Sequence, residues 1–239
     1  VELGFMNGVI DSQLRIIDAA RGDLMVLDPR RSHLNKWDSL LPIRAQQIAA
    51  VEGVRSVSPV YQSGVPFRGA PDQPDHRITV VAFPPDDPPL ELGWNDATLQ
   101  LLRQPGVALL DRLSRPIYGE LVPGQDVWLD GYRLRLGGFV ALGPTVIIDG
   151  QIVTSESTFM TMHPGAHPQM VVVWIEAGAD VGQVQMRIRE QFGSAVDVFR
   201  KSELARRETD YLRRVAPLGL LFGAGMLAGT FVGLVICYQ

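Results

Sequence analysis

The chain has 239 residues, of which 46% are hydrophobic and 20% are charged, and its formal net charge is −4 at pH 7. This length allows one or two hydrophobic cores, and the mildly acidic balance argues against general affinity for nucleic acid. The chain has a single cysteine, Cys237, so no disulfide can form within it.

The first third of the chain alternates helices and strands. Apolar residues at helical spacing predict an amphipathic helix over 1–20. A second helix, over 42–52, is indicated by Pro42 in its first turn and by Gly53 at its end. Short apolar runs between and after these helices predict strands at 24–27, 54–61 and 78–83.

The middle of the chain is rich in turn signals. Residues 95–118 are expected to be mainly helical, with a break at Pro105 and Gly106. Two Asp-Gly dipeptides then predict hairpins, because Asp-Gly readily adopts the positive φ angles of a tight type I′ turn. The paired strands would be 127–129 with 132–136, around Asp130-Gly131, and 146–148 with 151–153, around Asp149-Gly150.

A strand and two helices are predicted after the hairpins. Residues 170–175 are continuously apolar, which is typical of a strand buried on both faces. Asp180 caps a helix that runs to Gln191. A charged helix over 202–214 follows, with oppositely charged residues one turn apart. These i,i+4 pairs are Glu203 with Arg207, Arg206 with Asp210, and Asp210 with Arg214.

The last segment, 215–238, contains no Asp, Glu, Lys, Arg or His. As a helix it would be about 36 Å long, enough to cross a hydrocarbon core of about 30 Å. We therefore expect a transmembrane helix over 215–239 and a chain that is a piece of a longer membrane protein. Small residues four apart favour close packing against another membrane helix. They are Gly219, Gly223, Gly225, Gly229 and Gly233.

The order of elements predicts an α+β body between two stalk helices. The strand–helix–strand segments 24–83 and 170–200 would form one lobe, and a hairpin-rich lobe over about 91–168 would be inserted into it. The basic residues beside the predicted span would by themselves favour a cytoplasmic body. A folded domain of this size crosses membranes regardless of local charge, so composition leaves the side open.

Motifs for catalysis are missing from the sequence. It contains no GxxxxGK[ST] loop, no GxSxG and no HExxH motif, which disfavours ATP hydrolysis and a hydrolase activity in this chain. His163 and His167 lie four apart, but prolines and a glycine interrupt the segment and favour a plain surface loop. We expect no catalytic residue, no cofactor and no metal site.

Several segments resemble the extracytoplasmic region of DevC-type ABC exporter permeases, of the MacB/FtsX-like family. The resemblance covers nearly the whole chain in order. Its more specific segments are LDRLSRPIYG (110–119) and TSESTF (154–159). The others are DLMVLDP (23–29), VSPVY (57–61), GPTVIIDGQIV (143–153), PLGLLFG (217–223) and VGLVICYQ (232–239).

This resemblance implies a two-lobed periplasmic domain between the first two membrane helices of a permease. It divides the chain into the end of the first membrane helix with its stalk (1–21), the MacB-like core (22–200), a second stalk (201–214) and the second membrane helix (215–239). Residues from about 11 to 214 would be periplasmic, and the protein would lie in the inner membrane.

The resemblance also implies a non-catalytic role and a set of partners. The permease would relay ATP-driven motion from a separate ATPase subunit to its periplasmic domain, through stalk residues Glu203, Arg206, Arg207, Asp210 and Arg214. Its partners would be a second copy of the chain, a periplasmic membrane-fusion adaptor, a TolC-like outer-membrane channel and the bilayer, with a lipid-like or other cargo. The alternative is a membrane-tethered periplasmic binding or sensor domain.

Overall fold

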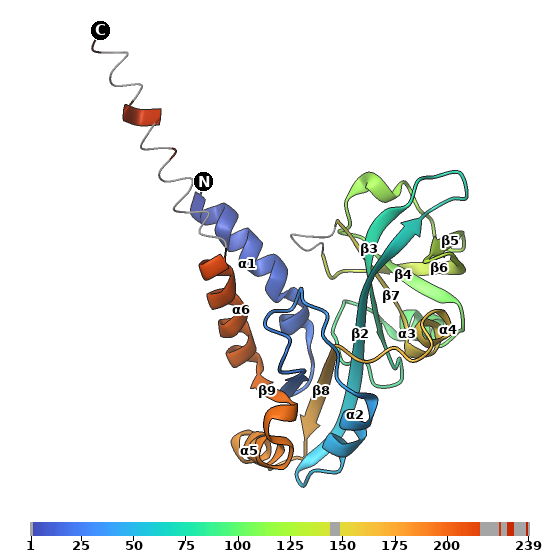
Figure 1. Ribbon diagram of the computed structural model, residues 1–239. Coiled ribbons are helices and arrows are strands. Elements are labelled where there is room, and N and C mark those ends of the chain that lie inside the picture. The colour runs from blue at the N-terminus through green and yellow to red at the C-terminus, as the bar shows by residue number, and fades with distance from the viewer. Residues whose placement is uncertain (1, 144–148, 216–224, 226–228, 232–237, 239) are drawn as a thin grey trace.

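The computed structural model describes residues 2–143, 149–215, 225, 229–231 and 238 (Figure 1). Its helices are α1 (Glu2–Ala19), α2 (Pro42–Ala49), α3 (Asp96–Leu102), η1 (Pro116–Tyr118), α4 (Glu156–Met162), α5 (Val181–Phe192), η2 (Gly193–Ala195) and α6 (Lys201–Val215). Its strands are β1 (Leu24–Leu27), β2 (Val54–Arg68), β3 (His76–Phe83), β4 (Val107–Asp111), β5 (Asp126–Leu129), β6 (Tyr132–Val140), β7 (Gln151–Ser155), β8 (Met170–Ile175) and β9 (Asp197–Arg200).

The first lobe is a four-stranded antiparallel sheet in the order β9-β1-β8-β2, formed with the first half of β2. Along the chain its elements follow as β1, α2, β2, β8, α5 and β9, which is a split β-α-β arrangement interrupted between β2 and β8. Both faces of this sheet are covered. Alternate residues of β1 and β8 therefore enter two different cores, which explains why these strands are apolar throughout.

The helices divide between the two faces of this sheet. Ile48 of α2 and Val184 of α5 pack on the face that carries Leu24 of β1. Ile17 of α1 and Leu204 of α6 pack on the other face. The predicted double burial of 170–175 is thus confirmed, and so is the cap of α5, where Asp180 accepts a hydrogen bond from the backbone N–H of Gln183 (2.8 Å).

The second lobe is a closed barrel of six strands. The pairings run β2-β3-β7-β4-β6-β5 and return to β2, so the second half of β2 is both the first and the last strand of the circuit. Apolar side chains such as Phe67, Ile78, Leu129 and Leu136 fill its interior. One long strand, β2, therefore belongs to both lobes and connects them (Figure 1).

Near Tyr61 the strand that pairs with β2 changes from β8 of the first lobe to β3 of the barrel. The sequence predicted that change near residue 91 and put 78–83 in the first lobe, but β3 pairs with β7 in the barrel. The consecutive apolar residues Val60 and Tyr61 enter different cores, so the alternation of β2 changes phase at the transition.

Two further sequence predictions need correction. Residues 107–118, expected to be helical, instead form strand β4 and the short helix η1. Val107–Asp111 lies between β6 and β7, and this burial overrides the helical propensity of its alanine and leucines. The first Asp-Gly hairpin is confirmed, with positive φ at Asp130 (49°) and Gly131 (80°). For the second predicted hairpin, residues 146–148 lie outside the described residues. Its other predicted strand is part of β7, which pairs with β3 on one side and with β4 on the other.

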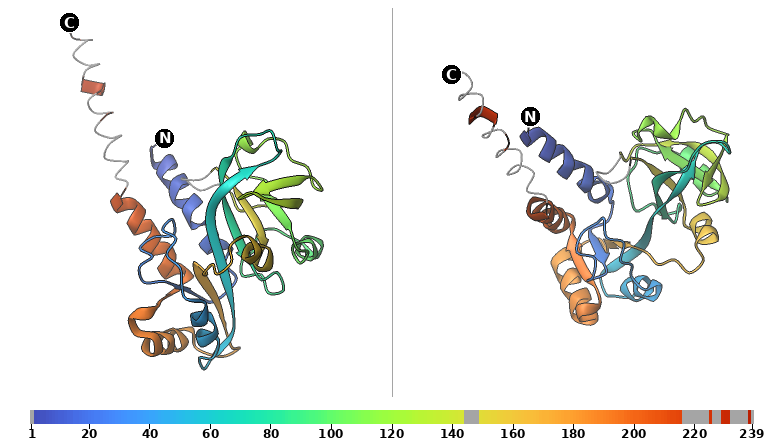
Figure 2. Two further views of the ribbon diagram at one scale, coloured as in Figure 1. Left: turned by 45° about the vertical axis from the view of Figure 1, so that its right-hand side comes forward. Right: turned by 45° about the horizontal axis from the view of Figure 1, so that its top comes forward.

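The helices α1 and α6 lie side by side and antiparallel, on one side of the first lobe (Figures 1 and 2). The start of α1 and the end of α6 therefore lie at the same end of the molecule, whereas α5 lies at the opposite end. Most of the predicted span over 215–239 lies outside the described residues. In the part of the chain that the structure does describe, no helix is long and apolar enough to cross a membrane.

Candidate functional site

A buried arginine fixes the connection between β1 and α2 to the body. The side chain of Arg31 is fully buried, and its Nη1 donates to the carbonyl oxygen of Gln169 beside β8 (2.7 Å). Its Nη2 donates to the carbonyl oxygen of Leu34 (2.6 Å) and to Oε1 of Gln62 on β2 (3.0 Å). The bond to Leu34 closes the connection on itself, and the other two hold it against the start of β8 and the barrel half of β2.

The helix α6 joins the same network through a buried carboxylate. Glu208 is 3% exposed, and its Oε2 accepts the backbone N–H of Leu34 (2.9 Å). Its Oε1 accepts a hydrogen bond from Nη2 of Arg207 (3.3 Å). A buried carboxylate is tolerated only when it is paired and hydrogen-bonded, and both conditions are met here. The stalk helix is therefore attached to the body by a specific polar contact and not by apolar packing alone.

The Glu208 carboxylate stabilises the charged form of the Arg31 guanidinium. Burial lowers the pKa of Arg31 to about 10, and the nearby Glu208 carboxylate opposes that shift. Arg31 thus remains a cation at neutral pH. Arg31 and Glu208 thus join α6, the loop at Leu34 and β2 in one hydrogen-bonded network. We call Arg31, Leu34 and Glu208 the stalk clasp.

A histidine next to the stalk clasp also contacts α6. The ring of His33 stacks on Tyr211, with 4.4 Å between ring centroids and 13° between ring planes. Burial lowers the pKa of His33, Glu208 raises it, and the cations Arg31, Lys36 and Arg207 lower it further, so that the net shift is downward from 6.5. The neutral imidazole is therefore the form that fits against α6.

This shift predicts that acid weakens the folded state at the stalk. Since the unfolded chain binds the His33 proton more readily, the stabilising effect is complete above pH 6.5 and is lost as the pH falls through the folded pKa. The urea midpoint of the wild-type chain should fall between about pH 7.5 and about pH 5. His33→Phe keeps a ring on Tyr211 and should make that fall smaller, whereas the control His167→Asn should not. An equal fall in all three chains would contradict the assignment.

The helix α1 contacts the barrel at a different place. Arg15 donates from Nη1 to the carbonyl oxygen of Leu142 (3.3 Å). The buried carboxylate of Asp111 accepts the backbone N–H groups of Leu142 (3.0 Å), Gly143 (2.7 Å) and Leu113 (3.1 Å). Gly143 has a φ of +91°, and a Cβ there would collide with Arg15. Glycine is therefore required where the stalk crosses this segment.

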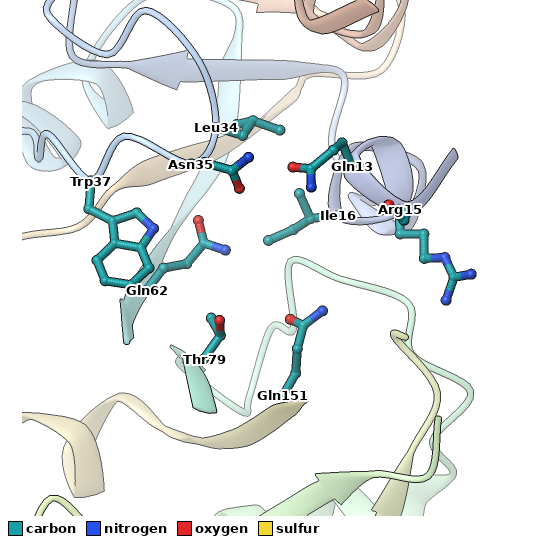
Figure 3. A pocket seen from close by; sticks show the side chains of 10 residues that line it. Gln13, Arg15, Ile16, Leu34, Asn35, Trp37, Gln62, Thr79 and Gln151 are labelled. Carbon is teal, nitrogen blue, oxygen red and sulfur yellow. The ribbon is translucent and has the colours of Figure 1, made fainter. Parts of the chain in front are cut away.

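A small polar cavity separates α1 from the barrel (Figure 3). Its volume is about 60 Å³, which is room for about two water molecules. Gln13 and Ile16 of α1 face Gln62, Thr79 and Gln151 of the barrel across it. The buried Nε2 of Gln13 has no hydrogen-bond partner among the described residues. Beside the cavity, Ile16 and Ile17 share a hydrophobic core with Val81 and Val153 of the barrel, so α1 also contacts the barrel by apolar packing.

The predicted stalk residues have two different environments. Glu203 accepts hydrogen bonds from Nε2 of Gln185 (2.6 Å) and from the backbone N–H of Arg200 (3.0 Å). Burial by itself would raise the pKa of Glu203, but these bonds and nearby arginines lower it. Arg207 contacts Asp197 and Glu208 and lies over the ring of Phe199 (4.4 Å). In contrast, Arg206, Asp210 and Arg214 are exposed.

The i,i+4 ion pairs expected along α6 do not form among the described residues 201–214, because Glu203 and Arg207 turn toward α5, β9 and the stalk clasp. Of the predicted packing glycines, Gly219, Gly223 and Gly233 lie outside the described residues. Gly225 and Gly229 are exposed, and no atom of the described residues lies within 4 Å of a Cβ placed on either.

The histidine pair does not come together as ligands. His163 packs on Phe159 (4.8 Å between ring centroids) and its Nε2 lies 3.7 Å from the carboxylate of Asp130. Within the described ranges, no group of three His, Cys, Asp or Glu side chains is placed to hold a metal ion.

The fold is similar to that of solved extracytoplasmic domains of transport proteins. The periplasmic region of MacB from Actinobacillus actinomycetemcomitans is 12% identical, with a TM-score of 0.55 over 79% of this chain and 92% of that chain. The extracellular domain of the noncanonic ABC-type transporter YknZ from Gram-positive bacteria is 15% identical, with a TM-score of 0.51 over 74% of this chain and 98% of that chain.

These likenesses show that the chain has the fold of the MacB periplasmic region, which confirms the α+β fold that the order of elements predicted. No protein-family model matches the chain. No curated protein matches it in sequence.

Proposed function

We propose that this chain is part of the permease subunit of a DevC-type ABC exporter, and that it relays ATP-driven motion from a cytoplasmic ATPase to an extracytoplasmic domain. The observation that carries the proposal is the antiparallel pair of α1 and α6, which leaves the body at one end and would continue into two membrane helices (Figure 1). The MacB-like fold of the body supports the same reading.

The finer features of the proposal follow from the family resemblance. The permease would lie in the inner membrane, with residues from about 11 to 214 in the periplasm. It would form a homodimer, bind a separate ATPase, and work with a membrane-fusion adaptor and a TolC-like channel. It would itself be non-catalytic, and its cargo would be lipid-like or of another class.

The two stalk helices would have different roles in this mechanism. The stalk clasp attaches α6 to the first lobe through buried charges, so a movement of α6 would carry that lobe with it. The described contact of α1 with the barrel consists of the apolar packing of Ile16 and Ile17 beside a small cavity and one hydrogen bond of 3.3 Å. We therefore assign force transmission to α6, with Glu203 and Arg207 anchoring its first turns.

The proposal is tested by the complete reading frame and its neighbouring ATPase. The frame should encode an apolar span before Val1 and two more after Gln239, and the permease should copurify with the ATPase from membranes. ATP should then change the distance between spin labels on the two copies of α6. A frame that ends in a cytoplasmic signalling module instead, with no bound ATPase, would favour the sensor alternative.

The predicted membrane segment gives a further expectation. Gly225→Leu or Gly229→Leu should impair export and helix packing, because leucine prevents the close approach that glycine allows. The body should remain folded, with an unchanged urea midpoint. The control is Leu227→Ile, which alters no small residue. Unchanged export in both glycine variants would remove the packing role.

A further inference from the structure

The connection between β4 and β5, residues 112–125, presents apolar side chains to solvent. Leu113 is 50% exposed, Ile117 is 44% exposed and Val122 is 60% exposed. Single exposed apolar residues are ordinary, but three on one short connection indicate a contact surface. We call residues 112–125 the apolar loop.

The apolar loop is held in place from behind. Tyr118 is buried, its hydroxyl donates to the carbonyl oxygen of Arg77 (2.8 Å), and its ring packs edge-on against Phe67 (5.6 Å). Arg115 pairs with the Asp149 carboxylate (2.9 Å) and donates its backbone N–H to the Asp149 carbonyl oxygen (2.8 Å). These contacts hold the apolar loop in place while its apolar side chains remain exposed.

The apolar loop lies at the end of the molecule where α1 begins and α6 ends. In Figure 1 it is the green segment with a short helix above the barrel, and the two views of Figure 2 agree with this placement. The helix α5 lies at the opposite end. A bilayer that receives the continuations of α1 and α6 would therefore face the apolar loop.

The charges at this end do not favour any particular lipid headgroup. The apolar loop, the neighbouring connection 69–75 and their ion-pair partners hold three arginines and four carboxylates. They are Arg68, Arg112 and Arg115, and Asp72, Asp75, Glu120 and Asp149. A contact made here would depend on apolar burial and not on attraction to anionic lipids.

We propose that the apolar loop rests on the lipid bilayer, with Ile117 and Val122 entering the headgroup region. This inference rests on the proposed function, because it requires a chain that is anchored beside the loop. The anchor holds the loop at high effective concentration near the lipid, so a contact too weak for a free domain becomes populated. The barrel would then be a second support on the membrane, next to the two stalk helices.

The test uses the 239-residue chain in phosphatidylcholine nanodiscs. A fluorophore is attached to Ile117→Cys, Val122→Cys or Met186→Cys, each in a Cys237→Ser background, and is quenched by lipids that carry a nitroxide at the headgroup. Met186 is the control, since it is 54% exposed on α5 at the opposite end. A label on the native Cys237, measured with lipids that carry the nitroxide in the acyl chain, reports insertion of the anchor.

Quenching at positions 117 and 122 should exceed that at 186 by roughly threefold, and replacing a third of the lipid with phosphatidylserine should not raise it. If position 237 is quenched but 117 and 122 match 186, the contact is overturned and the anchor stands. If 237 is not quenched by nitroxide in the acyl chain, the anchor fails and the contact fails with it. Cross-linking of position 117 to a second copy, without quenching by lipid, would show a protein interface and overturn the contact.

Discussion

Replacing Arg31 with methionine is expected to lower the free energy of unfolding by about 3–5 kcal/mol, because buried acceptors left without a donor cost about 1–3 kcal/mol each. The carbonyl oxygens of Leu34 and Gln169 and Oε1 of Gln62 would lose their donor, while Glu208 would keep its ion pair with Arg207. For a chain of this size the loss corresponds to a fall of about 10 °C in Tm. Urea unfolding followed by tryptophan fluorescence measures it.

Two companion variants separate charge from packing. Arg206→Met removes an exposed cation from α6 and should change the free energy of unfolding by less than about 0.5 kcal/mol. The double variant Arg31→Met with Glu208→Leu should lose less than the sum of the two single variants, because the electrostatic attraction between the two side chains is lost only once. If Arg31→Met cost no more than Arg206→Met, the stalk clasp would not be a structural element.

Asp111→Ala is expected to have the second largest effect, about 3 kcal/mol or more. Asp111 is the shared acceptor for the backbone N–H groups of Leu113, Leu142 and Gly143, and each buried donor left unpaired costs about 1–3 kcal/mol. The segment that Arg15 of α1 contacts would lose its support. Hydrogen exchange should therefore accelerate at the amides of Leu142 and Gly143 before it does in β8.

The control for this variant is Asp126→Ala, which removes an exposed carboxylate at the start of β5. Its stability should lie within about 0.5 kcal/mol of the wild type. Unchanged exchange at Leu142 and Gly143 in Asp111→Ala would show that Asp111 does not position the contact with α1.

Local signals in the sequence predicted most of the first lobe. The apolar strands at 24–27 and 170–175 and the Asp180 cap have causes that lie within a few residues, and each is present in the structure. The helix over 107–118 was wrong because Val107–Asp111 takes its conformation from β6 and β7, which are distant in the sequence.

The candidate site was much less predictable. Arg31 stands beside Arg30, whose side chain is 72% exposed, and no local pattern distinguishes the buried arginine from the exposed one. Glu208 likewise looks like one charge among many on α6. Both are buried because α6 packs against the β1–α2 connection, a contact between residues more than 170 positions apart. Sequence spacing had instead paired the charges of α6 with one another.

We expect α6 and the first lobe to move as one unit during the ATP cycle. The test is the distance between spin labels at Arg206→Cys on α6 and Met186→Cys on α5, in the complete permease with its ATPase, without nucleotide and with ATP trapped. This distance should change by less than about 2 Å, while the distance between the two copies of position 206 should change by more. A large change from α6 to α5 with no change between the copies would show instead that α6 moves independently of the first lobe.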